Sequence, residues 1–130
     1  MESNVEIVRA LSAALEQGDP LAIMARVTRD VVWTVHAADP DAAPWFGTYR
    51  GKRELLDLFA ALGTLTFTDV THKGMVADGD LVMVWLGISL TTPNGTDVQM
   101  DEVQIWTLAD GRVVAVDVLC DTAAVAAGFS

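Results

Sequence analysis

Acidic residues interrupt strongly apolar segments of this sequence, and carboxylates in such places can transfer protons. Asp117 breaks the apolar run from Val113 to Leu119. Burial disfavours the charged form of a carboxyl group, so its pKa rises toward neutrality, where the group can act as a general acid or base. We therefore predict that Asp117 is a catalytic residue facing a pocket. The alternative interpretation is that it faces solvent or a contact between two copies of the chain.

A second acidic position is the adjacent pair Asp101 and Glu102. Side chains of a strand alternate between its two faces, so one carboxylate points inward and the other outward. Asp101 shares its face with Val103, and Glu102 shares its face with Trp106. Because both faces are apolar, periodicity does not decide which carboxylate faces a pocket. A position of both at a rim or an interface also stays open.

The two histidines are further candidates for proton transfer. His36 ends the predicted strand Val31–His36, and the ordinary pKa of histidine suits a proton acceptor. We include His36 as a catalytic candidate, with a hydrogen-bonded structural role as the alternative. His72 is interpreted as a position on the surface of a sheet. Since neither histidine has carboxylates at a metal-ligand spacing, we expect no metal site and no cofactor.

Four large aromatic residues could form the walls of a site for an aromatic or polycyclic ligand. These candidates for substrate binding are Trp33, Trp45, Tyr49 and Trp106. Most tryptophans in so short a chain belong to the core. Trp45 and Tyr49 lie in a long irregular segment, and such loops often carry function, so these two are favoured to touch a ligand.

Helices are predicted in the first half of the chain. Ser3 and Glu6 form a capping box ahead of a first helix, which Gly18 ends. Asp19-Pro20 begins a second, short helix whose apolar face includes Val27. The pattern then predicts a strand over 31–36, an irregular loop over 37–50 and a helix over 52–62.

The second half reads as β-structure. Four apolar runs, over 65–76, 81–92, 98–108 and 112–119, are separated by Asp78-Gly79, Asn94-Gly95 and Asp110-Gly111. These dipeptides tolerate the positive φ angles of tight hairpin turns, which predicts an antiparallel meander. Asp121 then caps a short C-terminal helix. The order predicts an α+β domain with helices on one face of a curved antiparallel sheet, enclosing an apolar cavity as the default small-molecule site.

One predicted strand is apolar on both faces. Leu81, Met83 and Trp85 alternate with Val82 and Val84. A strand of this kind needs a cover on its outer face, and for a short chain a second copy is the simplest cover. We therefore expect a homodimer formed through the sheet.

Composition limits the class of protein. The chain has 130 residues, 52% of them hydrophobic, and 8 basic against 18 acidic residues give a formal net charge of −10. This length fits one domain over residues 1–130. The negative charge argues against nucleic acid and against anionic membrane surfaces as partners. With one cysteine and neither a signal-peptide pattern nor a spanning segment, the expected location is cytoplasmic.

One segment carries a family resemblance. The run Phe46–Phe59, with Gly47-Thr48-Tyr49-Arg50-Gly51-Lys52 at its start, resembles the Gly-x-Tyr-x-Gly-Lys/Arg signature of SnoaL-like domains. These belong to the nuclear-transport-factor-2-like superfamily, together with ketosteroid isomerases, polyketide cyclases and limonene epoxide hydrolase. Val31-Val32-Trp33 and Asp110-Gly111-Arg112-Val113 also resemble that group, so the resemblance covers nearly the whole chain.

The resemblance implies a conical α+β barrel in which a curved, mainly antiparallel sheet packs against three helices of the N-terminal half. It also implies a dimer and a pocket between sheet and helices. The family's enzymes move protons next to a carbonyl, or activate water, with pocket carboxylates, histidine and tyrosine and without metal. The isomerases place an aspartic acid on the strand of Asp101, which favours that residue over Glu102, and the family often places a pocket-facing side chain at the position of Asp117.

Two functions follow as hypotheses. The first is an acid/base enzyme of cyclase or isomerase type acting on a small, apolar carbonyl compound. The second is a non-catalytic small-molecule binder or accessory dimer of the same fold. Departures from the family narrow the first hypothesis: Tyr49 is the only tyrosine and lies in the loop, and residues 81–108 contain no Arg or Lys. The sequence therefore shows neither the catalytic residues of the isomerases nor those of the epoxide hydrolase, whereas a reaction of polyketide-cyclase type remains compatible with it.

Overall fold

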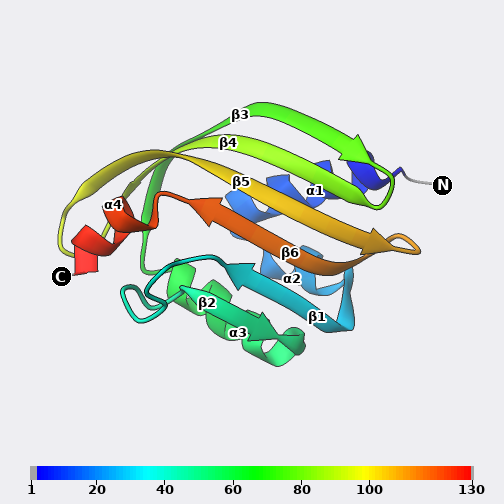
Figure 1. Ribbon diagram of the computed structural model, residues 1–130, viewed down its shortest axis with the longest axis horizontal. Helices are drawn as coiled ribbons and strands as arrows, with labels where there is room; N and C mark the ends of the chain where they lie inside the picture. The colour runs from blue at the N-terminus through cyan, green and yellow to red at the C-terminus, as the bar shows by residue number, and fades with distance from the viewer. Residues whose placement is uncertain (1–2, 130) are drawn as a thin grey trace.

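The computed structural model describes residues 3–129, so Met1, Glu2 and Ser130, at the ends of the predicted domain, lie outside the described residues. Helices precede most of the strands, as expected (Figure 1). In chain order the elements are α1 (Asn4–Glu16), α2 (Pro20–Met24), β1 (Val27–Val35), β2 (Gly47–Arg50), α3 (Gly51–Leu62), β3 (Thr66–Asp78), β4 (Leu81–Thr91), β5 (Asp97–Ala109), β6 (Arg112–Cys120), α4 (Thr122–Ala126) and a 3₁₀ turn, η1 (Ala127–Phe129).

The six strands form one sheet in the order β2-β1-β6-β5-β4-β3. Strands β1 and β6 run parallel, and every other neighbouring pair is antiparallel. The sheet is strongly curved, and α1, α2 and α3 lie on one side of it (Figure 1). Helix α3 packs on β1 and β2, while α1 packs on β3 and β4. The predicted α+β class is confirmed, but β2 and β3 remain separate edges, so the sheet does not close into a barrel.

The predicted helix starts are confirmed by their capping bonds. The Glu6 backbone N–H donates to Ser3 Oγ at 3.1 Å, and Ser3 Oγ donates to Glu6 Oε1 at 3.2 Å. Asp19 accepts from the backbone N–H of Ala22. The bonds from the Glu6 and Ala22 backbone N–H groups satisfy donors that have no partner within their helices, whereas the bond from Ser3 to Glu6 joins two side chains.

Two sequence predictions about the first sheet edge are wrong. Strand β1 begins at Val27 rather than Val31, because α2 ends after a single turn at Met24 and Val27 pairs with Val113 of β6. The predicted loop over 37–50 contains β2, which pairs with β1 through Trp33 and Tyr49. Four residues carry too short a pattern to predict a strand, and the pairing with β1 is a long-range interaction.

The sheet separates two chemically different faces. On β4, Val82, Val84 and Leu86 point inward and are at most 3% exposed. The alternate residues Met83 and Trp85 point outward and are 41% and 47% exposed. The strand is therefore apolar on both faces, as the sequence indicates, and only its inner face is covered by the helices.

The structure explains why the second position of glycine in the signature, Gly51, requires this residue type. Gly51 joins β2 to α3 with φ at +78°, and a Cβ atom there would lie 3.5 Å from the Arg29 carbonyl oxygen. Residues with a Cβ atom rarely adopt this left-handed conformation. The glycine therefore lets the chain leave the sheet edge and enter the helix that covers the cavity.

We predict that Gly51→Ala destabilises the protein by about 1–2 kcal/mol, because alanine must adopt the left-handed conformation. Urea unfolding measures the effect. The matched control is Gly74→Ala, since Gly74 has no positive φ and its added Cβ would lie 3.9 Å from Trp85. Equal stability of the Gly51→Ala variant and the unsubstituted protein would contradict the argument.

Candidate active site

A cavity of about 400 Å³ lies between the inner face of the sheet and the helices. Its walls come from α1, α3, strands β1 and β3–β6, and the segments that follow α1, β1 and α3. Most of the lining is apolar, and representative side chains are Leu15, Leu58, Phe59, Leu62, Leu86 and Leu90. A volume of this size suits a small organic ligand.

Glu102 is the acidic residue that β5 presents to this cavity. Its register neighbours are Leu86 on β4 and Cys120 on β6, and both also line the cavity. Burial among these groups disfavours the carboxylate and raises the pKa of Glu102 to about 7, although a hydrogen bond from Gln104 acts in the opposite direction. Near neutral pH Glu102 therefore occurs both as the protonated acid, which can donate a proton, and as the carboxylate, which can accept one.

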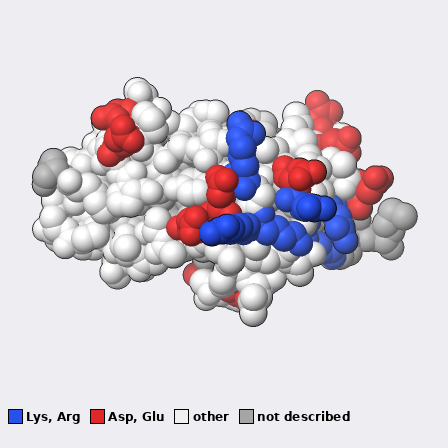
Figure 2. Space-filling model, turned by 90° about the horizontal axis from the view of Figure 1, so that it is seen from below, with Lys and Arg blue, Asp and Glu red and all other residues white. Residues whose placement is uncertain are grey.

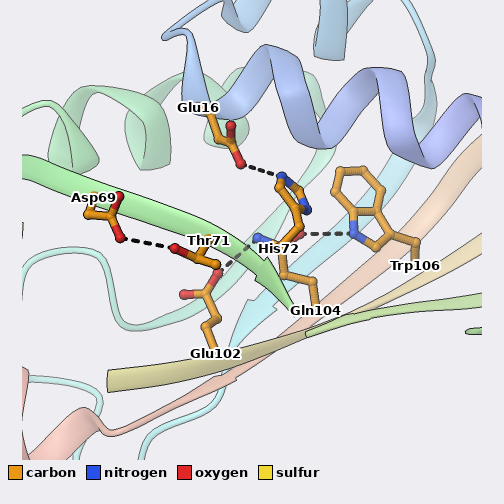
Figure 3. Close-up of polar contacts among 7 residues, drawn as sticks. All are labelled: Glu16, Asp69, Thr71, His72, Glu102, Gln104 and Trp106. Atoms are coloured by element: carbon orange, nitrogen blue, oxygen red, sulfur yellow. Dashed lines mark hydrogen bonds and ion pairs between the residues drawn. The ribbon is translucent and has the colours of Figure 1, made fainter. Parts of the chain in front are cut away.

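A chain of hydrogen bonds along β5 orients Glu102 (Figure 3). Trp106 Nε1 donates to Gln104 Oε1 at 3.1 Å, and Gln104 Nε2 donates to Glu102 Oε2 at 2.8 Å. Because an indole N–H only donates, it determines which end of the Gln104 amide accepts and which end donates. Trp106 is fully buried, so the chain is anchored in the core and ends on one oxygen of a cavity carboxylate.

Asp101 points to the other face of the sheet, so the preference of the sequence analysis for Asp101 over Glu102 as the pocket residue is not met. Its carboxylate accepts hydrogen bonds from Lys73 Nζ at 2.7 Å and Trp85 Nε1 at 3.2 Å. The bond from Lys73, followed by that from Trp85, lowers the pKa of Asp101. Strand alternation separates the two adjacent carboxylates, and the pairing of Asp101 with Gly87 assigns Asp101 to the outer face.

Asp117 and His36 form a pair away from the cavity lining. His36 Nε2 lies 2.8 Å from Asp117 Oδ1, and the two side chains are 48% and 39% exposed. Asp117 pairs with Ile105 of β5, which shares the outer face with Asp101. The predicted pocket positions of Asp117 and His36 are therefore not met. This outer position is the alternative that the sequence left open for Asp117.

His72 lies on the edge strand β3 with its side chain 44% exposed, which agrees with the surface position expected from the sequence. It pairs in register with Leu86, on the inner side of β3, and its Nε2 forms an ion-pair contact with Glu16 at the end of α1 (Figure 3). Glu16 lines the cavity. The pair therefore ties α1 to the edge strand beside the cavity.

The four aromatic candidates divide into two groups. Trp33 and Trp45 line the cavity. Tyr49 does not: its hydroxyl donates to the Pro44 carbonyl oxygen at 3.3 Å, and burial raises its pKa. Trp106 lies behind the cavity wall, where it acts through Gln104. Two of the predicted ligand contacts are therefore placed at the cavity and two are not.

The polar cavity residues that the sequence analysis missed include Ser12, Glu16, Gln104 and Cys120. Burial raises the pKa of the Cys120 thiol to about 12, with the Glu102 carboxylate as a further cause.

The sequence contains a signal that favours Glu102 as the cavity residue. Glu102, Gln104 and Trp106 share one face of β5, and three side chains that can hydrogen-bond in series indicate a polar strip in an apolar wall.

Within residues 3–129 no cluster of three or more His, Cys, Asp or Glu side chains is arranged to hold a metal ion. None of the helices in this range combines the length and the apolar character needed to cross a bilayer.

Comparison with known proteins identifies the family. The profile of the SnoaL-like domain family matches residues 8–116. The chain belongs to the SnoaL-like family. No curated protein matches the chain at a significant level.

Solved structures show the same fold. A nuclear-transport-factor-2-like protein from Burkholderia thailandensis is 28% identical, with a TM-score of 0.84, and the match covers 100% of this chain and 99% of that one. A protein of unknown function with a cystatin-like fold from Xanthomonas campestris is 21% identical, with a TM-score of 0.86 and 99% of each chain covered. A candidate SnoaL-like polyketide cyclase from Mesorhizobium loti is 20% identical, with a TM-score of 0.74, and the match covers 90% of this chain and 98% of that one.

The raised pKa of Glu102 makes stability depend on pH. The folded protein holds its proton up to about pH 7, whereas an ordinary glutamate loses it near 4.5. The associated stability is therefore fully present below about pH 4.5 and is lost as the pH rises through about 7. We predict that Glu102→Gln removes this loss and, at about pH 8, stabilises the protein by up to about 3 kcal/mol.

Chemical unfolding at several pH values measures this dependence. The control is Asp101→Asn, which removes the adjacent carboxylate on the exposed face and should leave the decline between about pH 4.5 and 7 in place. The interpretation is wrong if Glu102→Gln and the unsubstituted protein show the same pH profile.

Proposed function

We propose that this SnoaL-like protein is an acid/base enzyme of cyclase or isomerase type that acts on a small, apolar carbonyl compound, with Glu102 as the proton-transferring residue. The observation that carries the proposal is a carboxyl group with a pKa of about 7 in the wall of a mostly apolar cavity. The family match and the candidate polyketide cyclase among the structural neighbours agree with this class of reaction.

The chemistry of the proposed step follows from the position of Glu102. Its ionised carboxylate removes a proton from a carbon next to the substrate carbonyl, and the electron pair of the broken C–H bond moves into an enolate. The protonated Glu102 then returns the proton, to another carbon in an isomerisation or to the oxygen formed when the enolate attacks a second carbonyl in a cyclisation. A pKa near the working pH suits both halves of this cycle.

The hydrogen-bond chain gives Glu102 a defined orientation. Gln104 binds Oε2, so Oε1 remains the oxygen that can meet a substrate C–H bond. The same bond stabilises the carboxylate form and keeps the pKa from rising further. Trp33 and Trp45 supply flat apolar walls, which suit an aromatic or polycyclic ligand.

The first test uses β-tetralone, an apolar bicyclic ketone with exchangeable hydrogens next to its carbonyl. We predict that the protein accelerates the incorporation of deuterium from D₂O into β-tetralone, followed by NMR. Glu102→Gln should lower this rate by about 100-fold or more, the usual contribution of a general base. Asp101→Asn is the matched control and should keep the rate, because Asp101 lies on the opposite face of β5.

Binding of β-tetralone without accelerated exchange would contradict the enzyme proposal. That outcome would favour the second hypothesis, a non-catalytic binder of small molecules with the same fold. Acceleration that survives in Glu102→Gln would instead reject Glu102 as the proton-transferring residue.

The partner proposed for the outer face of the sheet is a second copy of the chain. Val76, Leu81, Met83, Trp85 and Leu119 are all between 41% and 65% exposed and lie on β3, β4 and β6. An exposed apolar surface of this kind marks an interaction site in a protein that stays in solution. This face also carries Lys73 and Asp101, which contact Trp85, while a larger group of Lys and Arg side chains mixed with Asp and Glu lies on the side of β2 and α3 (Figure 2).

We predict that Met83→Asp weakens this association, because it places a charge in the centre of the proposed contact of a chain that already carries a net charge of −10. Analytical ultracentrifugation should show a dimer for the unsubstituted protein and a monomer for the variant. Leu21→Asp is the control, since Leu21 is 77% exposed on α2, away from the sheet. A monomeric unsubstituted protein would reject the homodimer.

A further inference from the structure

Ser12 is a buried polar side chain without a hydrogen-bond partner. It lies in α1, is 1% exposed, and its Oγ makes no hydrogen bond within the described residues. A helical serine usually satisfies its hydroxyl on the carbonyl oxygen one turn back, and this bond is not formed here. An unpaired buried hydroxyl is costly, so the residue is expected to have a partner in the working protein.

The position of Ser12 points to that partner, because Ser12 lines the cavity. Asn4 binds the Gly79 carbonyl oxygen near one end of α1, and Glu16 pairs with His72 at the other end, so the helix runs along β3. Ser12 lies one helical turn before Glu16. The helical wall of the cavity therefore presents the Ser12 hydroxyl and the Glu16 carboxylate, which is paired with His72, while the sheet wall presents the carboxyl group of Glu102, which has no cationic partner among the described lining residues.

The charges on the cavity walls determine how a carbonyl compound is oriented between the helices and the sheet. A carbonyl oxygen carries partial negative charge and gains more when an enolate forms, so the ionised Glu102 repels it. The described residues lining the cavity include no Lys or Arg, so a cationic side chain from the lining does not receive this oxygen. A neutral hydrogen-bond donor on another wall can bind the oxygen at a distance from the Glu102 carboxylate. An O–H group that points at an oxygen gaining negative charge stabilises that charge.

We propose that Ser12 donates a hydrogen bond to the carbonyl oxygen of the ligand, so that the bound compound is an enolisable ketone with its oxygen toward α1 and its acidic C–H bond toward β5. This inference rests on the proposed function, and it adds the orientation of the ligand and the residue that selects a carbonyl compound over a hydrocarbon of the same shape. Ser12 contacts the substrate in this arrangement, and Glu102 moves the proton.

The test compares β-tetralone with tetralin, which has the same ring system without the oxygen. Dissociation constants are measured by titration of intrinsic tryptophan fluorescence for the unsubstituted protein, for Ser12→Ala and for Ser89→Ala on the opposite face. We expect Ser12→Ala to weaken β-tetralone binding about tenfold, the usual effect of one lost hydrogen bond, and to leave tetralin binding unchanged. Ser89→Ala should change neither.

The outcomes separate this inference from the function on which it rests. If Ser12→Ala changes the two affinities by the same factor, Ser12 has a packing role and the inference is wrong, even when Glu102→Gln abolishes deuterium exchange. If neither compound binds the unsubstituted protein, the proposed ligand class itself is wrong, and the inference fails with it. Ser12→Ala should fold, because alanine is the strongest helix former, and a thermal midpoint at or above that of the unsubstituted protein would confirm that the unpaired hydroxyl is a cost to the empty cavity.

Discussion

The burial of one carboxyl group against an apolar cavity is the constraint on which the proposed chemistry depends. Without partners, Glu102 would resist ionisation and serve only as a neutral acid. The amide of Gln104 stabilises the charged form enough for both protonation states to occur near neutral pH. The indole of Trp106 orients that amide, and Trp106 is itself held in the core by edge-to-face contact with Trp33. Packing in the core thereby sets a property of the cavity.

The curved sheet is the second organising feature, because its two faces carry different kinds of side chains. The inner face carries the cavity, and the helices close it. The outer face carries exposed apolar side chains together with the ion pair of Lys73 with Asp101 and the hydrogen-bonded pair of His36 with Asp117. Charged groups near a surface keep most of their hydration, so their charge costs little free energy. The single acidic group on the inner wall of β5 is desolvated, so its charged form is unfavourable. This difference in cost is why Glu102, rather than Asp101 or Asp117, is proposed for chemistry.

Cavity and fold are linked by a few junctions. Gly51 turns the chain from β2 into α3, and the Glu16–His72 pair ties α1 to β3. At the other end of the molecule, Phe129 packs edge-to-face on Trp45, which lines the cavity. The helices and the C-terminal segment are thus held over the sheet at separate points, and the space between them stays open for a ligand.

The sequence by itself determined the local structure and the family. Capping residues such as Ser3 and Asp19 located the helix starts, and the Asp-Gly and Asn-Gly dipeptides located the hairpins, because these signals act over a few residues. The cavity expected between sheet and helices is present, and Trp33 and Trp45 line it. The short strand β2 and the early start of β1 escaped prediction, since both depend on pairing between distant segments.

Tertiary structure alone decided which carboxylate meets the cavity. Asp101 and Glu102 are neighbours in sequence and have apolar residues on both sides, so alternation guarantees opposite faces without saying which face is inside. The register of β5 with β4, and the packing of the helices on one side only, made that choice. The unpaired hydroxyl of Ser12 has the same origin, because a serine in an amphipathic helix gives no sign in sequence that its hydroxyl is buried against a cavity.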